Sequence, residues 1–313
     1  MNFLVIDSHK GANKPSQNMH WINAKIISDA LGADFIWSYP NVNDQIKSDY
    51  DAIIFVHASH YSYTDYKWIE KSPNAKLFYV TNEYNLGEPR TLWMAAKKAG
   101  RKYTVIANHP QKVSKVVNKY VDEWVQINLN SLVFNPTLKE QEKQEDQRTL
   151  FDFSGDASKV IYYGSFRKDR KEYFKKYLNQ SIVVSTHHSN RLKFHGLGVS
   201  PNFIDRLDWS GRGLFDYDLS LYIEDKTTHE NYNYLANRFY EALNYNCCSV
   251  FDKSCMNTTE KSGYKIGDDY FVDTSSDLLN KKNLVVPDAW RVEAKRERSE
   301  VLSNLLNLFG FEK

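Results

Sequence analysis

The chain has 313 residues, of which 42% are hydrophobic and 26% are charged, and its formal net charge at pH 7 is +2. This balance excludes a disordered chain, and the length favours two α/β domains over one large core. The opening MNFLVIDSHKG lacks both a basic flank and a small-residue cleavage site, which predicts a first strand and not a signal peptide. No apolar run approaches the roughly 20 residues of a membrane helix. We therefore expect a cytoplasmic protein with no membrane partner.

Three cysteines, Cys247, Cys248 and Cys255, lie close together in a stretch that is typical of a buried strand and the turn after it. They have no CxxC spacing and no neighbouring histidine, so buried or free thiols are favoured over a zinc site. Free thiols in turn favour a reducing compartment.

The first half of the chain alternates short β-rich runs with amphipathic segments. The predicted strands are Phe3–Ile6, Asp34–Trp37, Ala52–Val56, Lys76–Val80, Tyr103–Ala107 and Glu123–Gln126, and the predicted helices are Ser16–Leu31, Asp65–Lys71, Arg90–Ala99 and Pro110–Tyr120. Strands separated by helices indicate a parallel, doubly wound sheet, here a Rossmann-like domain over residues 1–150. Near its end, KEQEKQEDQR (139–148) contains no apolar residue and is expected to be a linker, an exposed excursion or a solvated helix.

The second half repeats this pattern over residues 151–290. Its predicted strands are Lys159–Tyr163, Ile182–Ser185, Leu219–Ile223, Ser249–Asp252 and Tyr270–Val272. The last segment, Pro287–Phe311, is predicted to be one long amphipathic helix whose leucines must pack on another surface.

One candidate site follows the predicted strand VIYYGS. Gly164 and Ser165 end this strand, and the residues after them are strongly basic, with Arg167, Arg170 and Lys171 among them. Ligands of open α/β sheets bind at the carboxyl ends of strands, where a glycine permits close backbone approach and guanidinium groups bind diphosphate oxygens. The pattern indicates a diphosphate site, although an ordinary basic first turn of a helix would look similar.

A second candidate is NYLANRFYEALNYNCCSVFD (233–252), a predicted helix followed by a strand. Arg238 and Glu241 lie three residues apart and therefore side by side on the helix. They would form a surface ion pair, or they would hold a nucleotide, with the carboxylate accepting two ribose hydroxyls and the arginine facing phosphates.

These two motifs, VIYYGSFRKDRKEY and NYLANRFYEALNYNCCSVFD, resemble those of the T-even phage DNA β-glucosyltransferases in order and spacing. Looser likeness covers most of the chain, including KIISDALGADF, KLFYVTNEYN, DWSGRGLFD and the terminal helix. The resemblance implies a GT-B glycosyltransferase, with two Rossmann-like domains, a deep cleft between them, and a C-terminal helix (291–313) that crosses back to the first domain. It also implies the cytoplasm of an infected host cell, and we expect a monomer.

The resemblance assigns roles to individual residues. Arg167 and Arg170, or Lys171 because the spacing differs by one, would bind the diphosphate beside Gly164 and Ser165, and Arg238 would join them. Glu241 would bind the ribose, and backbone groups at Arg212 and Gly213 would bind uracil. The implied donor is a UDP-sugar such as UDP-glucose or UDP-arabinose.

The expected catalytic base departs from the family pattern. The family has an aspartate after the threonine that ends a first-domain strand, whereas YVTNEYN has Asn82 there and Glu83 next to it. Asparagine cannot remove a proton, so Glu83 is the predicted base, with Glu88 and Asp7 as alternatives. The family's second acidic residue is also replaced, near Asn18, Met19 and His20. Transfer with retention of configuration would need no base, and a pentose is a plausible donor sugar.

The implied acceptor is double-stranded DNA with modified cytosine. Residues 90–119 contain no Asp or Glu but eight basic residues: Arg90, Lys97, Lys98, Arg101, Lys102, Lys112, Lys115 and Lys119. Such a stretch is suited to phosphate backbones, unless it is an ordinary solvated helix face. Tyr84, Trp93 and His109 would fill the gap left by a flipped base, with a core position for Trp93 as the alternative.

Two further hypotheses remain open from the sequence. A UDP-sugar transferase could act on a glycan, lipid or small molecule, or the chain could be a DNA-binding homologue without activity. A divalent metal, Mg²⁺ or Mn²⁺, is possible but not indicated, because Asp216 and Asp218 look like a turn before a strand and not a metal motif.

Overall fold

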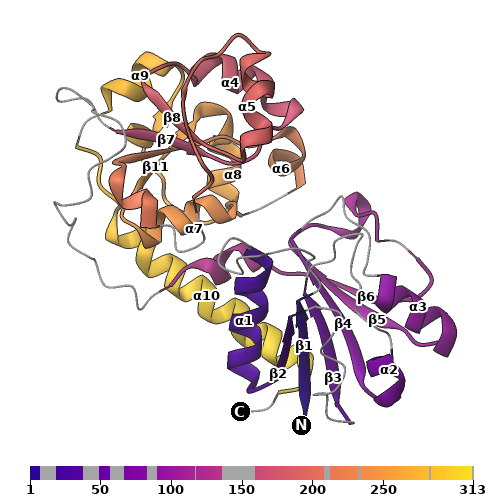
Figure 1. Ribbon diagram of the computed structural model, residues 1–313. Coiled ribbons are helices and arrows are strands. Elements are labelled where there is room, and N and C mark those ends of the chain that lie inside the picture. Colours follow the sequence, from indigo (N-terminus) through magenta and orange to yellow (C-terminus); the bar gives the residue numbers. More distant parts are fainter. Residues whose placement is uncertain are drawn as a thin grey trace. The chain divides into compact units, whose positions relative to one another are not determined.

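The computed structural model describes residues 1–7, 19–37, 49–56, 67–82, 90–116, 118–135, 159–207, 212–231, 234–281 and 283–311. The chain divides into two compact units (Figure 1). The N-terminal unit comprises Met1–Val133 with Glu297–Lys313, and the C-terminal unit comprises Phe134–Arg296.

The N-terminal unit is built on a six-stranded parallel sheet in the order β2-β1-β3-β4-β5-β6. The strands are β1 (Phe3–Asp7), β2 (Asp34–Trp37), β3 (Ala52–Val56), β4 (Lys76–Thr81), β5 (Tyr103–Ala107) and β6 (Val121–Gln126). Every residue of β1 and of β3 is buried. Continuous apolar runs are typical of strands that are covered on both faces, which explains why the sequence pattern located them.

Helices cover both faces of this sheet: α1 (Met19–Leu31), α2 (Lys67–Lys71) and α3 (Arg90–Ala99), with 3₁₀ turns η2 (Gln111–Val113) and η3 (Leu129–Val133). One core cluster joins α2 and α3 to the sheet, and the other joins α1 and η3. The predicted helix Pro110–Tyr120 is wrong, because η2 is the one helical turn among the residues described there, 110–116 and 118–120. Ser114 Oγ accepts a hydrogen bond from the Val116 N–H, and Asn118 Oδ1 accepts one from the Tyr120 N–H. Such local side-chain bonds favour turns over a helix.

The C-terminal unit has a second parallel sheet of six strands, in the order β12-β11-β10-β7-β8-β9. Its strands are β7 (Val160–Tyr163), β8 (Ile182–Ser185), β9 (Asn202–Ile204), β10 (Leu219–Tyr222), β11 (Cys248–Asp252) and β12 (Phe271–Val272). All five predicted strands are present. The sequence pattern did not predict β9. This edge strand has three residues, all half-buried, so it has no continuous apolar run.

The helices of this unit are α4 (Lys171–Tyr177), α5 (His188–His195), α6 (Lys226–Asn231), α7 (Asn237–Asn244), α8 (Met256–Lys261) and α9 (Ser275–Asn280), with 3₁₀ turns η4 (Lys168–Arg170), η5 (Arg212–Asp216), η6 (Lys253–Cys255) and η7 (Asp268–Tyr270). The three cysteines are free and buried, as predicted.

The predicted terminal helix is observed as α10 (Asp288–Phe309). Its first turns belong to the C-terminal unit, where the buried Trp290 packs against Phe239 and Tyr270. Its later turns belong to the N-terminal unit. There Phe309 meets Phe78 with 4.9 Å between ring centroids, in the same core cluster as Leu305. The helix therefore contributes apolar residues to both cores.

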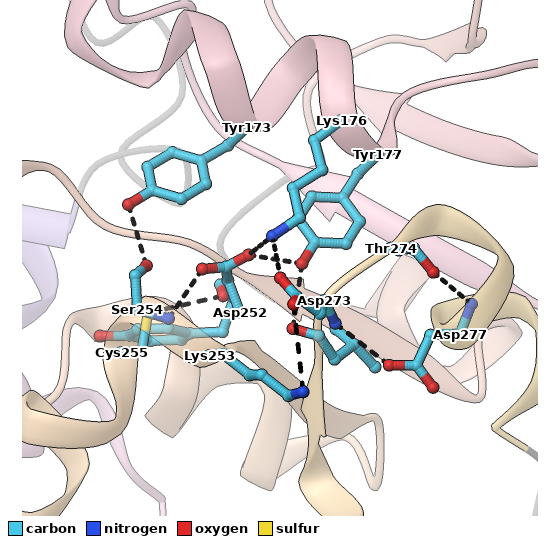
Figure 2. Close-up of polar contacts among 12 residues, drawn as sticks. Tyr173, Lys176, Tyr177, Asp252, Lys253, Ser254, Cys255, Asp273, Thr274 and Asp277 are labelled. Carbon is cyan, nitrogen blue, oxygen red and sulfur yellow. Dashed lines mark hydrogen bonds and ion pairs between the residues drawn. The ribbon is translucent and has the colours of Figure 1, made fainter.

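A polar network fixes α4 to the edge of the second sheet (Figure 2). Asp252, the last residue of β11, is 2% exposed and accepts hydrogen bonds from Lys176 Nζ at 2.8 Å and from Tyr177 Oη at 2.5 Å. Its other oxygen accepts from the Ser254 N–H at 2.8 Å. Lys176 also pairs with the exposed Asp273 at 2.6 Å. Since α4 begins directly after the basic turn at Arg170, this network holds the helix that follows the candidate diphosphate site.

We expect Asp252→Asn to lower the free energy of unfolding by about 1–3 kcal/mol, because it removes a buried, charge-assisted set of hydrogen bonds. The same hydrogen bonds lower the pKa of Asp252 against the opposing effect of burial. A lowered pKa stabilises the fold above the unfolded-state value, about 3.9, and this stability is lost as the pH falls through the folded-state pKa. Urea unfolding measures this at pH 7 and pH 3. The difference in the free energy of unfolding between the variant and the parent should be smaller at pH 3 than at pH 7.

The matched control is Asp273→Asn, which removes a carboxylate that contacts the same lysine but is exposed. It should leave the unfolding midpoint nearly unchanged. Equal effects of the two substitutions would contradict the role assigned to Asp252.

Candidate functional site

The turn after β7 requires a glycine. Gly164 has φ of +153°, and a Cβ at this position would lie 3.3 Å from Tyr162 Oη. Its N–H donates to the Ser185 carbonyl of β8 at 3.0 Å, which fixes the turn at the carboxyl edge of the sheet. Ser165 and Arg167 follow as exposed residues. The backbone therefore brings the basic segment directly to the edge where ligands of parallel sheets bind.

Arg170 does not present an open charge at this edge. It is 6% exposed, and its Nη2 atom lies 2.7 Å from Glu224 Oε2 and 3.1 Å from Asp225 Oδ2. Burial alone would lower the pKa of Arg170, but the adjacent Glu224 carboxylate raises it, so the guanidinium stays charged. The expectation that Arg170 faces a diphosphate is thus corrected to a buried ion pair. Arg167 is exposed and Lys171 is half-buried, and neither has an ion-pair partner among the described residues.

Arg238 lies in the first turn of α7 and points toward the end of β10. Its Nε atom is 3.5 Å from Glu224 Oε1, and its Nη1 atom donates to the Ile223 carbonyl at 3.3 Å. The guanidinium carbon is 5.9 Å and 5.7 Å from the ring centroids of Tyr162 and Tyr222. Cation–π contacts and the carboxylate hold the positive charge in place. The ion pair of Arg238 is therefore with Glu224, and not with Glu241 as one interpretation of the sequence had it.

Glu241 lies one turn further along α7. Burial raises the pKa of its carboxyl to about 7, although the charge of Arg238, the Tyr163 hydroxyl and the charge of Arg206 act in the opposite direction. Tyr163 Oη also lies 2.5 Å from the Arg238 carbonyl, so the end of β7 positions α7. A carboxyl group with this pKa can accept hydrogen bonds fully only at neutral or alkaline pH.

Three site residues were missed from the sequence: Glu224, Tyr163 and Arg206. Glu224 follows LSLYI, and the rule that strand ends carry site residues would have found it. Tyr163 was taken only as a strand residue. Arg206 lies after the missed β9, so no strand end marked it.

Gly213 lies in η5, where a Cβ would come within 2.5 Å of Leu207 Cδ2. The next residue, Leu214, packs in the same cluster as Ala242 of α7, so η5 and α7 lie on one face of the sheet. Residues 208–211 lie outside the described residues, and Arg212 is described only in its backbone. Base recognition by this stretch stays a prediction.

In the N-terminal unit, Asn82 follows β4 and belongs to a network of amides. Its Oδ1 accepts from Asn23 Nδ2 at 3.3 Å, and its Nδ2 donates to Asn130 Oδ1 at 3.0 Å. Asn108 Nδ2 also donates to Asn130 Oδ1, at 2.7 Å. Asn82 is thus held as a neutral donor and acceptor, which fits a supporting role and no proton transfer.

The candidate bases Glu83 and Glu88 lie outside the described residues, as do Asn18 and Tyr84. Met19 and His20 begin α1, but their side chains are not described. Asp7 is buried at the carboxyl end of β1.

Several of the basic residues predicted to bind DNA are already engaged within the N-terminal unit. Lys98 pairs with Glu70, and Lys102 pairs with Asp122 at 3.0 Å. Arg101 donates to the carbonyls of Ile69 and Ser72, which ties α3 to the end of α2. The carboxylates that pair with these lysines, Glu70 and Asp122, come from α2 and β6. The absence of Asp and Glu from residues 90–119 therefore did not predict the charge of the surface around them.

The basic residues also lie at opposite ends of the sheet. Lys97, Lys98, Arg101 and Lys102 precede β5 in the chain and lie near its amino end, whereas Lys112 and Lys115 follow its carboxyl end. A strand of this length separates the two groups by about 16 Å. Lys112 and Lys115 are exposed and have no ion-pair partner among the described residues. Arg90 begins α3, but its side chain is not described.

His109 is not available to fill the gap of a flipped base. It is fully buried and packs on Trp124, with 5.4 Å between ring centroids. Burial lowers its pKa to about 4 because the charged form is disfavoured. Trp93 is half-buried on α3, with Lys97 Nζ 4.9 Å from its ring centroid.

Neither known family models nor curated proteins match this sequence. Several solved structures match the fold of this chain. The T4 phage β-glucosyltransferase, described with its substrate binding and proposed catalytic mechanism, superposes with a TM-score of 0.61 at 15% identity, over 99% of this chain and 96% of that chain. The chain has the β-glucosyltransferase fold.

Two further structures agree. A structure of the DNA-modifying enzyme β-glucosyltransferase, with and without uridine diphosphoglucose, gives a TM-score of 0.63 at 16% identity, over 99% of this chain and 96% of that chain. The T4 phage enzyme in complex with UDP and Mn²⁺ superposes with a TM-score of 0.58 at 14% identity, over 99% of this chain and 97% of that chain. The likeness in the two motifs thus correctly predicted the GT-B architecture of two Rossmann-like units.

Within the described ranges, no three His, Cys, Asp or Glu side chains are grouped so as to hold a metal ion. The described helices include none long and apolar enough to cross a membrane.

We expect Tyr163→Phe to raise the pKa of Glu241 above 7, because the Tyr163 hydroxyl acts to lower that pKa and is lost in the variant. Carbon-detected NMR of labelled glutamate side chains would follow the titration of Glu241. A midpoint for Glu241 near 4.5, or no change in the variant, would contradict the assigned geometry.

Proposed function

We propose that this protein is a glycosyltransferase that moves a sugar from a UDP-sugar to a hydroxyl group on a modified cytosine of DNA. The observation that carries the proposal is the arrangement around α7. Arg238 is fixed by Glu224 at the carboxyl edge of a parallel sheet, and Glu241 lies one turn along the same helix.

The chemistry of this edge fits uridine diphosphate. Arg238 offers a planar donor to phosphate oxygens, and Arg167 and Lys171 add positive charge beside the Gly164–Ser165 turn. Glu241 accepts hydrogen bonds from both ribose hydroxyls, and main-chain groups at Arg212 and Gly213 contact the base. Support comes from the fold, since related structures are described with UDP and with uridine diphosphoglucose.

In the proposed reaction, the acceptor oxygen attacks the anomeric carbon and forms the new C–O bond. The bond from that carbon to the diphosphate breaks, and UDP leaves with the electron pair. Glu83 takes the proton of the acceptor hydroxyl. Its neighbour Asn82 follows β4 and is held there by Asn23 and Asn130. The donor sugar is glucose or a pentose such as arabinose.

DNA is the proposed acceptor because Lys112 and Lys115 are exposed at the carboxyl end of β5 without compensating acids among the described residues. They provide two phosphate contacts at the sheet edge where the acceptor should dock.

A transfer assay tests the activity. Incubation with a panel of UDP-sugars should release UDP only when DNA containing 5-hydroxymethylcytosine is present, and mass spectrometry of the nucleosides should find a glycosylated cytosine. Glu83→Gln should abolish transfer while UDP binding persists. Transfer to a glycan would replace the proposed acceptor, and DNA binding without transfer to any acceptor would favour a non-catalytic homologue.

Donor binding should depend on pH through Glu241. Because its pKa is raised to about 7, UDP affinity should be constant above pH 8 and fall by up to about tenfold per pH unit below 7, where the acid form dominates. Calorimetry between pH 5.5 and 8.5 measures this. Glu241→Ala should bind UDP weakly at every pH and keep its salt-sensitive DNA binding. Tight UDP binding by this variant would refute the site.

The two groups of lysines permit a matched test of DNA binding. The double variant Lys112→Gln/Lys115→Gln should bind DNA more weakly and reduce the slope of log affinity against log salt by about 2, since each phosphate contact contributes about 0.9. Lys98→Gln/Lys102→Gln removes the same charge from paired lysines and should change little. If Lys98→Gln/Lys102→Gln weakened DNA binding more, the DNA-binding surface would lie at the amino end of β5 and not at its carboxyl end.

A further inference from the structure

Glu224 is a buried carboxylate between two arginines. It lies two residues after the end of β10 and is 2% exposed. A buried charge is tolerated only when it is paired and hydrogen-bonded. Its Oε2 atom contacts Arg170 at 2.7 Å, and its Oε1 atom lies 3.5 Å from Arg238 Nε. One carboxylate therefore serves two positive groups from different segments.

The two arginines depend on Glu224 to different degrees. Arg170 has a second carboxylate, Asp225, at 3.1 Å. Within the described residues, Arg238 has its ion pair with Glu224 alone, with the Ile223 carbonyl and two tyrosine rings as its other contacts. The charge of Arg170 acts against that of Arg238. Loss of Glu224 would therefore leave Arg238 without an ion-pair partner among the described residues, beside a second guanidinium group that keeps only Asp225.

The contacts also orient the guanidinium group of Arg238. Nε faces Glu224 and Nη1 donates to a carbonyl, while Nη2 has no hydrogen-bond partner among the described residues. The Arg238 side chain is 15% exposed. A guanidinium group binds phosphate in bidentate fashion through two N–H groups on one edge, and Nη2 is the nitrogen of Arg238 that is left for a phosphate contact.

We infer that Glu224 is a positioning residue that holds Arg238 for the diphosphate of the donor, without itself touching the nucleotide. The inference deepens the proposed function and rests on it. It separates two tasks at this edge: Glu224 and Arg238 act on the diphosphate, whereas Glu241 acts on the ribose.

The test measures the affinities of UDP and uridine by calorimetry for the parent, Glu224→Gln, Arg238→Gln and the double variant. We expect Glu224→Gln to weaken UDP binding by about tenfold or more and to leave uridine binding unchanged. In the Arg238→Gln background, Glu224→Gln should cause no further loss, because the group it positions is absent. A purely structural role would weaken both ligands and would be additive with Arg238→Gln.

Asp225→Asn is the matched control, since it removes a carboxylate from Arg170 but not from Arg238. It should lower thermal stability while UDP affinity is kept. Should Glu224→Gln fail to fold, Glu224→Asp retains the charge at a shorter reach and should show the same loss, selective for UDP.

Unchanged UDP affinity in the Glu224 variants, or an equal loss in Asp225→Asn, overturns the inference alone. A parent protein that binds no UDP overturns the proposed function and this inference with it.

Discussion

The site in the C-terminal unit depends on one buried carboxylate. Glu224 neutralises Arg170 on one side and faces Arg238 on the other, and these two arginines join the β7 turn to α7. Without a counter-charge, two guanidinium groups would not be stable at a nearly solvent-free position. The surrounding tyrosines add to this constraint, since Tyr162 and Tyr222 lie against the Arg238 guanidinium and Tyr163 binds its carbonyl. These contacts fix the helix that carries Glu241 to the ends of β7 and β10.

The two units use the same architecture with different chemistry at their strand ends. In the C-terminal unit, charged side chains meet at the ends of β7 and β10. In the N-terminal unit, the ends of β4 and β5 are joined by the amides of Asn82, Asn108 and Asn130. A neutral network of this kind holds loops in position without creating a strong field. The two units therefore differ in the charge that their strand ends present.

The basic residues 90–119 show how far local sequence and local charge can differ. Lys98 and Lys102 are paired with acids from α2 and β6, and Arg101 is used to fix α3 to α2. Lys112 and Lys115, beyond the carboxyl end of β5, are exposed and have no ion-pair partner among the described residues. The charge of a surface therefore depends on residues that are neighbours in the sheet as well as on residues that are neighbours in the chain.

The sequence alone determined the α/β class, eleven of the twelve strands, the need for glycine at Gly164 and the helix that places Arg238 near Glu241, because buried parallel strands and helical spacing are local patterns. Only the tertiary structure decided that Arg170 is paired internally, that Glu224 lies between Arg170 and Arg238, and that η2 replaces a predicted helix. Those outcomes depend on ion pairs and hydrogen bonds between strand ends and helices that lie far apart in the chain. Local propensity carries no information about such partners.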